Sequence, residues 1–167
     1  MRSDKIYLVG FMGAGKSSLA RKLGRRLGWK VEDVDDRIEA RERRSISEIF
    51  AQSGEAHFRL VERVVVRDLL PLRHVVVATG GGTFVDADSR SAILADGAVF
   101  WLDVPFQVLL DRIPVDGSRP LAPNRTQMEQ LYLMRLGAYT QAHVRLDGAR
   151  QSIGELADFV IEWLGTA

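Results

Sequence analysis

The chain has 167 residues, of which 46% are hydrophobic and 27% are charged, and its 23 lysines and arginines nearly balance its 22 aspartates and glutamates. These values are typical of one folded domain, and the small net charge gives no general attraction to nucleic acid or to an anionic membrane. Cysteine is absent, which excludes disulfides, thiolate nucleophiles and zinc–thiolate sites. Because no apolar run is long enough for a membrane span or a signal peptide, we expect a cytoplasmic protein.

A glycine-rich segment near the start of the chain carries the first functional signal. Residues 10–17 read Gly-x-x-x-x-Gly-Lys-Ser, after a short apolar strand at 6–9 and before a helix from Ser18. This is the pattern of a phosphate-binding loop, whose glycines let backbone N–H groups point inward at the positive end of the helix. We expect Lys16 to reach the β- and γ-phosphates of a nucleotide and the Ser17 hydroxyl to ligate Mg²⁺.

Strands and helices alternate along the rest of the chain. The apolar spacing predicts strands over residues 6–9, 30–34, 74–78, 98–102 and 144–146, and helices over 18–27, 37–44, 55–70, 86–96, 105–112, 126–142 and 152–164. Ser45 and Glu48 form a capping-box pattern that predicts a further helical turn ending near Gly54. This alternation predicts an α/β fold with a parallel sheet covered by helices.

Residues 113–125 differ from their surroundings in composition. They contain three prolines and one glycine and have no apolar period. Such a segment is typical of a mobile loop, and we interpret it as a candidate lid. The chain shows no internal repeat, low-complexity tract or second domain, so we expect one domain over residues 1–167.

Two aspartates follow the second predicted strand. Asp33 and Asp35 flank Val34, so both carboxylates would face the same side of the sheet if this segment were extended. In one interpretation Asp35 only caps the next helix. In the other, one carboxylate orients the water shell of Mg²⁺ and the other accepts a hydrogen bond from an acceptor hydroxyl. The residues themselves leave both interpretations open.

Basic side chains and glycines appear at other places where ligands bind open α/β sheets. Arg59 and Glu62 are spaced i, i+3 on a helix, where the carboxylate can hold the guanidinium. Gly80–Gly82 would form either a flexible turn or a surface of bare backbone amides. Arg119, in the candidate lid, would close on a transferring phosphoryl group. Taken alone, Arg119 and Arg135 also fit exposed arginines.

In its ordered motifs the chain resembles the shikimate kinase family from about residue 6 to residue 146. The motifs are Gly10-x4-Gly15-Lys16-Ser17, Asp33-x-Asp35 with Ile38-Glu39, Gly54 with Phe58-Arg59 and Glu62, Gly80-Gly81-Gly82, Arg119-Pro120-Leu121, and Arg135. The resemblance implies the three-layer fold of P-loop NTPases, with a central parallel five-stranded sheet, a helical substrate-binding region over about 33–62 and a lid over about 113–125. It also implies transfer of the γ-phosphate of ATP to the 3-hydroxyl of shikimate, in the biosynthesis of chorismate and aromatic amino acids.

The same resemblance implies roles for individual residues. The implied catalytic residues are Lys16, Asp35 and Arg119. The implied nucleotide-binding residues are Gly13, Ala14, Gly15, Lys16, Ser17, Ser18, Arg112, Arg119 and Gln151, with Arg150 as the alternative to Gln151. The implied shikimate-binding residues are Asp35, Arg59, Gly81 and Arg135, and the implied Mg²⁺ ligands are Ser17 and Asp33. Two arginines and one aspartate suit an acceptor that carries a carboxylate and hydroxyls. Shikimate and ATP would be the partners of a monomer that binds neither nucleic acid nor membrane.

Three residues bear on which acceptor the protein binds: one departs from the family pattern, and two are bulky. Gly137 stands two residues after Arg135, where the family commonly has proline. Met12 and Phe84 are bulky residues near the expected pocket, and they would either belong to the core or reshape the acceptor site. Two alternatives therefore stay open: a kinase for another small hydroxy acid such as gluconate or for a nucleoside monophosphate, and a nucleotide-binding regulatory module. The presence of Asp35 favours an enzyme.

Overall fold

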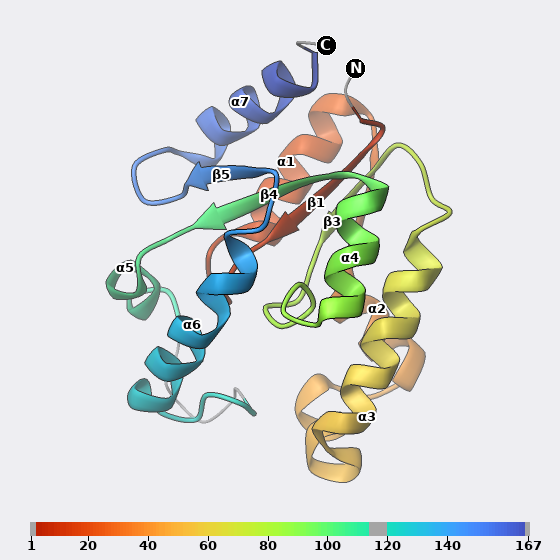
Figure 1. Ribbon diagram of the computed structural model, residues 1–167, viewed down its shortest axis with the longest axis vertical. Coiled ribbons are helices and arrows are strands. Elements are labelled where there is room, and N and C mark those ends of the chain that lie inside the picture. The colour runs from red at the N-terminus through yellow and green to blue at the C-terminus, as the bar shows by residue number, and fades with distance from the viewer. Residues whose placement is uncertain (1–2, 114–119, 166–167) are drawn as a thin grey trace.

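The computed structural model describes residues 3–113 and 120–165 (Figure 1). These residues form one sheet of five strands in the order β2-β3-β1-β4-β5, and all four pairings are parallel. The strands are β1 (Lys5–Val9), β2 (Lys30–Asp33), β3 (Val75–Ala78), β4 (Ala98–Asp103) and β5 (Val144–Asp147). The predicted five-stranded parallel sheet is therefore confirmed.

Helices cover both faces of this sheet and give the three layers predicted from the sequence (Figure 1). They are α1 (Lys16–Leu27), α2 (Val34–Glu42), α3 (Ile46–Leu69), α4 (Ala87–Asp96), α5 (Phe106–Leu110), α6 (Arg125–Tyr139) and α7 (Ile153–Gly165). Helices α1 and α7 pack together on one face, whereas α3 and α4 contact each other on the opposite face. Within the described ranges, no helix combines the length and apolar character needed to cross a bilayer.

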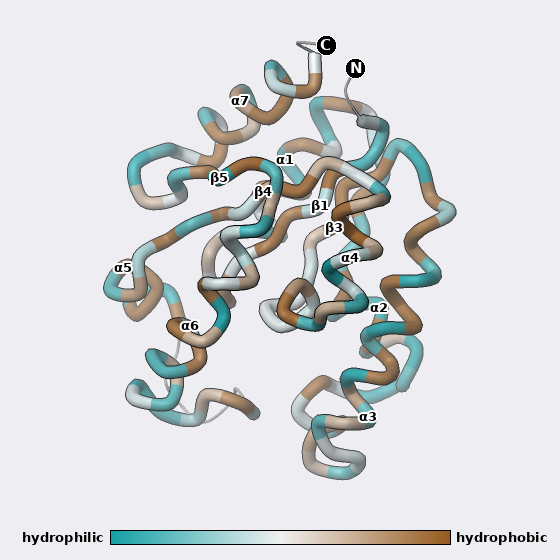
Figure 2. Tube along the Cα trace, in the orientation of Figure 1, coloured by the Kyte–Doolittle hydropathy of each residue, from teal (hydrophilic) through white to brown (hydrophobic). Residues whose placement is uncertain are grey.

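The core follows the central strands. Every residue of β1 and β3 is buried, as expected for strands that helices cover on both sides. Figure 2 shows hydrophobic residues along these strands and alternating hydrophobic and hydrophilic segments along α3. One buried residue was not predicted: β1 begins with Lys5, whose side chain is fully buried, whereas the sequence pattern placed the start of the strand at residue 6.

The predicted geometry of the two aspartates is wrong. Strand β2 ends at Asp33, whose carboxylate accepts hydrogen bonds from the backbone N–H groups of Asp35 (2.9 Å) and Asp36 (3.3 Å). Asp33 is thus the N-cap of α2, and the helix begins at Val34 rather than at residue 37. Asp35 therefore lies in the first turn of a helix, and it is Asp33 that caps this helix.

Helices α2 and α3 contact each other and contain most of residues 33–62, the segment for which a substrate-binding region is predicted (Figure 1). The capping box at the start of α3 is present, with the Ser45 hydroxyl accepting from the Glu48 N–H and the Glu48 carboxylate accepting from the Ser45 N–H. The predicted helical turn and the predicted long helix are both present within α3, on either side of a kink at Gly54, where the backbone is not helical and φ is 81°. Because only glycine adopts such a φ at little cost, Gly54 lets the helix change direction over the pocket described below.

The candidate lid is described only in part. Helix α5 ends at Leu110 and α6 begins at Arg125, and residues 120–124 between them have no regular secondary structure. Arg119, the predicted catalytic arginine of this segment, lies outside the described residues.

Candidate active site

The phosphate-binding loop joins β1 to α1 at the carboxyl edge of the sheet. Gly13 and Gly15 have φ values of 75° and 104°, a conformation that side chains other than hydrogen disfavour. The Lys16 ammonium donates to the backbone carbonyls of Gly10 (2.7 Å) and Phe11 (2.9 Å). The lysine is therefore held against the loop at the N-terminus of α1, where phosphate groups bind in such loops.

Two segments flank this loop. After α5, Arg112 Nη1 donates to the Ala14 carbonyl at 3.5 Å. Before α7, the Gln151 N–H donates to the Asp147 carbonyl at 3.3 Å, and Ile153 Cδ1 would lie 3.5 Å from a methyl group at Gly15. Arg112 and the segment that contains Gln151 thus lie beside the loop, and neither residue lines the cavity described below.

Ser17 and Asp33 provide a small set of oxygen ligands beside the loop. The Ser17 hydroxyl donates to Asp33 Oδ2 at 2.9 Å. Among the described residues, no group of three or more histidine, cysteine, aspartate or glutamate side chains could hold a metal ion. Mg²⁺ in phosphoryl-transfer enzymes is commonly bound by one or two protein oxygens together with phosphate oxygens. The two side chains fit that kind of site.

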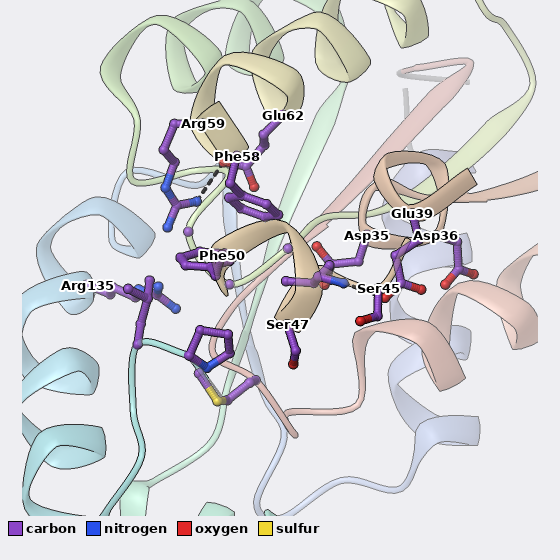
Figure 3. Close-up of a pocket in the computed structure, with 17 residues that line it drawn as sticks. Asp35, Asp36, Glu39, Ser45, Ser47, Phe50, Phe58, Arg59, Glu62 and Arg135 are labelled. Atoms are coloured by element: carbon purple, nitrogen blue, oxygen red, sulfur yellow. Dashed lines mark hydrogen bonds and ion pairs between the residues drawn. The ribbon is translucent and has the colours of Figure 1, made fainter. Parts of the chain in front are cut away.

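A cavity of about 380 Å³ lies beside the loop, between α2, α3, the glycine segment after β3 and α6 (Figure 3). Its lining residues are Met12, Asp35, Asp36, Glu39, Ser45, Ile46, Ser47, Phe50, Phe58, Arg59, Glu62, Gly80, Gly81, Gly82, Pro120, Leu121 and Arg135. The four predicted acceptor residues, Asp35, Arg59, Gly81 and Arg135, therefore meet in one cavity. Figure 3 shows the two arginines on one side and the carboxylates from α2 on the other, so the cavity has a cationic end and an anionic end.

The three consecutive glycines after β3 each lie against a different side chain of this cavity. A methyl group at Gly80 would come within 2.7 Å of Asp35 Oδ1. At Gly81 the methyl group would come within 2.7 Å of Arg135 Nη1, and at Gly82 it would come within 2.5 Å of Arg59 Nη1. None of the three has a positive φ, so the lack of a side chain, rather than backbone freedom, explains glycine at these positions. The segment is neither only a flexible turn nor only a surface of amides, because it makes room for three charged groups.

The Arg59 guanidinium is held in place by a buried carboxylate, that of Glu62. Its Nη1 donates to Glu62 Oε1 at 2.7 Å, and Glu62 Oε2 accepts from the Thr83 hydroxyl at 2.7 Å. The Glu62 side chain is only 2% exposed, whereas that of Arg59 is 23% exposed. The Arg59 guanidinium also lies 5.1 Å from the centre of the Phe58 ring. The predicted i, i+3 pair is present and fixes the orientation of the guanidinium.

Arg135 is the buried counterpart of Arg59. It is 5% exposed, and its guanidinium lies 5.7 Å from the centre of the Phe11 ring. Burial lowers the pKa of Arg135, the Tyr139 hydroxyl opposes this, and the charge of Arg59 adds to it. The group stays charged because the pKa of a guanidinium starts far above neutrality. Gly137 occupies a regular turn of α6 with open space beside it, so this departure from the family pattern leaves Arg135 in the cavity.

Asp35 lies at the anionic end, next to the phosphate-binding loop. Burial and the nearby charge of Asp33 raise its pKa to about 6, while Lys16 acts in the opposite direction. A carboxylate with such a pKa can accept a proton close to neutral pH, as a general base must.

The two bulky residues noted in the sequence have different places. Phe84 is fully buried and belongs to the core. Met12 is partly buried and lines the cavity, so it belongs to the site. Ser47 and Phe50 also line the cavity, from the first turns of α3, and were not predicted from the sequence. The capping box located the start of this helix, but no spacing in the sequence indicated which way it faces.

A family model and individual known proteins are similar to this chain in sequence. A family model described as shikimate kinase matches residues 12–165. A shikimate kinase of Persephonella marina is 35% identical over 157 residues, which are 93% of this chain and 96% of that protein. One of Geobacillus thermodenitrificans is 39% identical over 167 residues, covering 97% of this chain and 89% of that protein.

Solved structures are also similar. The shikimate kinase from Acinetobacter baumannii in complex with shikimate has a TM-score of 0.91 and 32% identity, over 98% of this chain and 93% of that chain. A gluconokinase from Sinorhizobium meliloti has a TM-score of 0.64 and 15% identity, over 96% of this chain and 91% of that chain. The second similarity shows the fold alone.

Proposed function

Because the chain belongs to the shikimate kinase family and phosphorylates shikimate with ATP as co-substrate, we propose which of its residues bind the two substrates and transfer the phosphoryl group. The product is shikimate 3-phosphate, on the route to chorismate and aromatic amino acids. The alternatives of a gluconate kinase and of a regulatory module are thereby set aside.

The observation that carries the proposal is the opposed charge of the cavity next to the phosphate-binding loop. Arg59 and Arg135 bind the carboxylate of shikimate, since guanidinium groups pair with carboxylates through two parallel hydrogen bonds. The Gly81 backbone amide contributes at the same end. Asp35, at the other end, accepts a hydrogen bond from the 3-hydroxyl, and the shikimate ring lies between the two ends.

Asp35 and Lys16 act on the transfer itself. As the 3-oxygen of shikimate forms a bond to the γ-phosphorus, the bond from that phosphorus to the β–γ bridging oxygen breaks and ADP leaves. The proton of the hydroxyl passes to Asp35. The Lys16 ammonium stabilises the charge on the transferring group, and Arg119 adds a second cation from the lid. A closed lid also excludes water, which would otherwise compete as the acceptor.

The nucleotide lies along the loop. The backbone N–H groups of residues 13–18 hold its phosphates, and Arg112 and Gln151 contact the adenine from the two flanking segments. Ser17 and Asp33 would hold Mg²⁺, which supplies positive charge to the phosphate oxygens when it is bound. We further propose that the enzyme works as a cytoplasmic monomer of one domain over residues 1–167, without nucleic acid. Support for a monomer is that all lining residues of the cavity among the described ones come from one chain.

A coupled ADP-release assay with Mg-ATP tests these roles. Shikimate, gluconate and a blank without acceptor are compared, and we expect ADP release only with shikimate. Lys16→Ala and Asp35→Asn should each lower kcat by about 10²-fold or more, with ATP binding largely retained in Asp35→Asn. Arg59→Ala should mainly raise the KM for shikimate. The control is Asp158→Asn, which changes an exposed carboxylate on α7. Full activity of Asp35→Asn would remove this residue from the mechanism.

A further inference from the structure

One buried hydroxyl behind the cavity joins two of its parts. Tyr139, the last residue of α6, is 1% exposed, and its hydroxyl donates to the Gly81 carbonyl at 2.5 Å. Its ring lies 6.2 Å from that of Trp101 on β4. The ring contact holds Tyr139 to the sheet, and the hydrogen bond holds the glycine segment to α6.

The same hydroxyl interacts with Arg135. The two residues are four apart on α6 and therefore lie on the same side of the helix. Burial raises the pKa of Tyr139 to about 12, and the charge of Arg135 and a side-chain hydrogen bond with it act in the opposite direction. A neutral phenol can accept one hydrogen bond and donate another. Here the hydroxyl donates to the Gly81 carbonyl, and Gly81 in turn lies against Arg135, because a methyl group at Gly81 would come within 2.7 Å of Arg135 Nη1.

The hydrogen bond to Gly81 also fixes the next amide. Carbonyl and N–H point in opposite directions across a planar trans peptide, so the direction of the Gly81 carbonyl determines that of the Gly82 N–H. Gly81 and Gly82 line the cavity, whereas Tyr139 does not. With the carbonyl turned toward Tyr139, the Gly82 N–H is turned away from Tyr139.

We infer that Tyr139 is a positioning residue for the carboxylate of the acceptor, because its hydroxyl fixes the Gly81–Gly82 peptide directly beside the Arg135 guanidinium. The inference rests on the proposed carboxylate site. Tyr139 touches neither substrate; it sets the geometry around Arg135 and Gly81, the two residues proposed above to contact the carboxylate. Without the hydroxyl, Arg135 and the peptide would have to be ordered by the substrate itself, which weakens binding.

The test is Tyr139→Phe, which removes the hydroxyl and keeps the ring. We expect the KM for shikimate to rise about five- to ten-fold, the loss typical of one hydrogen bond, with kcat and the KM for ATP changing less than about two-fold. Tyr132→Phe is the matched control, because Tyr132 lies on the same helix and donates to a backbone carbonyl, that of Val104, outside the cavity. KM does not depend on the fraction of enzyme that is folded, so the measurement survives partial unfolding of the variant.

An acceptor with an alcohol in place of the carboxylate separates positioning from a structural role. For this analogue, wild type and Tyr139→Phe should have equal kcat/KM, because Arg135 and the glycine segment have no carboxylate to pair with. The double variant Tyr139→Phe with Arg135→Lys should raise the KM for shikimate by less than the product of the two single-variant factors. An unchanged shikimate KM in Tyr139→Phe, or an equal loss with both acceptors, would overturn the inference. If Arg59→Ala also left shikimate binding unchanged, the carboxylate site itself would be misplaced, which distinguishes the two failures.

Discussion

The backbone of Gly82 lies so close to Arg59 that one added methyl group would come within 2.5 Å of Nη1 and 2.6 Å of Nη2. Gly82→Ala should therefore push the guanidinium out of its place. Because the same Nη1 donates to Glu62 at 2.7 Å, a shift of the guanidinium would disturb that ion pair. We expect the KM for shikimate to rise by about ten-fold or more, with the KM for ATP unchanged in steady-state assays.

Gly154→Ala is the control for this variant. A methyl group at Gly154, in α7, would meet nothing closer than the Ser152 hydroxyl at 3.7 Å. This control should have the shikimate KM of the wild type. If Gly82→Ala also had that KM, the position of the guanidinium would not matter for acceptor binding.

The pH dependence of the rate follows from Asp35. Its pKa of about 6 means that the carboxylate is mostly ionised at pH 7 and mostly protonated at pH 5. Only the ionised form can take the proton of the hydroxyl, so kcat/KM for shikimate should fall as the pH falls, by up to about ten-fold per unit below pH 6. A profile from pH 5 to pH 8 checks this, and a flat profile over that range would contradict the role of Asp35.

The ionised carboxylate of Asp35 should make the substrate-free enzyme less stable than a variant with a neutral side chain at this position. The pKa of Asp35 is raised from 3.8 to about 6, so the folded state binds a proton more tightly than the unfolded state does. Any stability that this proton provides is fully present below pH 4 and is lost as the pH rises through 6. Asp35→Asn should therefore be more stable than wild type by about 1–3 kcal/mol at pH 7 and by close to zero at pH 4. Urea unfolding at the two pH values measures the difference, and equal stability at pH 7 would mean that the ionised carboxylate is well solvated.

The position of the two aspartates at the edge of the sheet is predictable from the sequence, but their geometry is not. The order of residues places Asp33 and Asp35 at the carboxyl edge of the sheet, where the structure has them. It could not show that the Asp33 side chain accepts from the N–H groups of the following turn. That local bond starts the helix three residues early and turns Asp35 toward the cavity, and strand and helix propensities do not encode it.

The glycine segment illustrates a different limit. The sequence indicated that Gly80–Gly82 lies near the site, because it follows a buried strand. What each glycine is near depends on α2, α3 and α6, which are distant in sequence and meet only in the folded chain. Position at the end of a strand was predictable from local patterns, whereas contact with Asp35, Arg135 and Arg59 was not.

Lys5 gives a prediction about stability alone. Its ammonium donates to the carbonyls of Leu69 and Leu70 at the end of α3, at 2.9 Å each, and to Asp96 Oδ2 at 2.6 Å. Lys5→Met removes this buried cation, leaves the two carbonyls without this donor, and leaves Asp96 with only the Tyr7 hydroxyl and the more exposed Arg73 as side-chain partners. We expect a loss of about 3–5 kcal/mol in the free energy of unfolding, measured with urea, and an unchanged shikimate KM for the folded enzyme. Lys30→Met, on an exposed residue of β2, is the control; a similarly small effect of both variants would contradict the assignment of Lys5 to the core.

Gly137 allows the opposite prediction, a gain in stability without loss of function. It lies inside α6, has no positive φ, and a methyl group there would meet nothing within 4 Å. Alanine lowers the entropy of the unfolded chain and favours the helix, so Gly137→Ala should stabilise the protein by about 0.5–1 kcal/mol. Gly24→Ala is the contrasting variant, because a methyl group at this helical glycine would collide with Val31, and it should destabilise. Thermal unfolding checks both signs, and the shikimate KM of Gly137→Ala shows whether glycine at this position affects Arg135. An unchanged KM is expected because Arg135 is buried against the Phe11 ring. An altered KM would mean that the missing side chain at residue 137 helps to set the direction of Arg135.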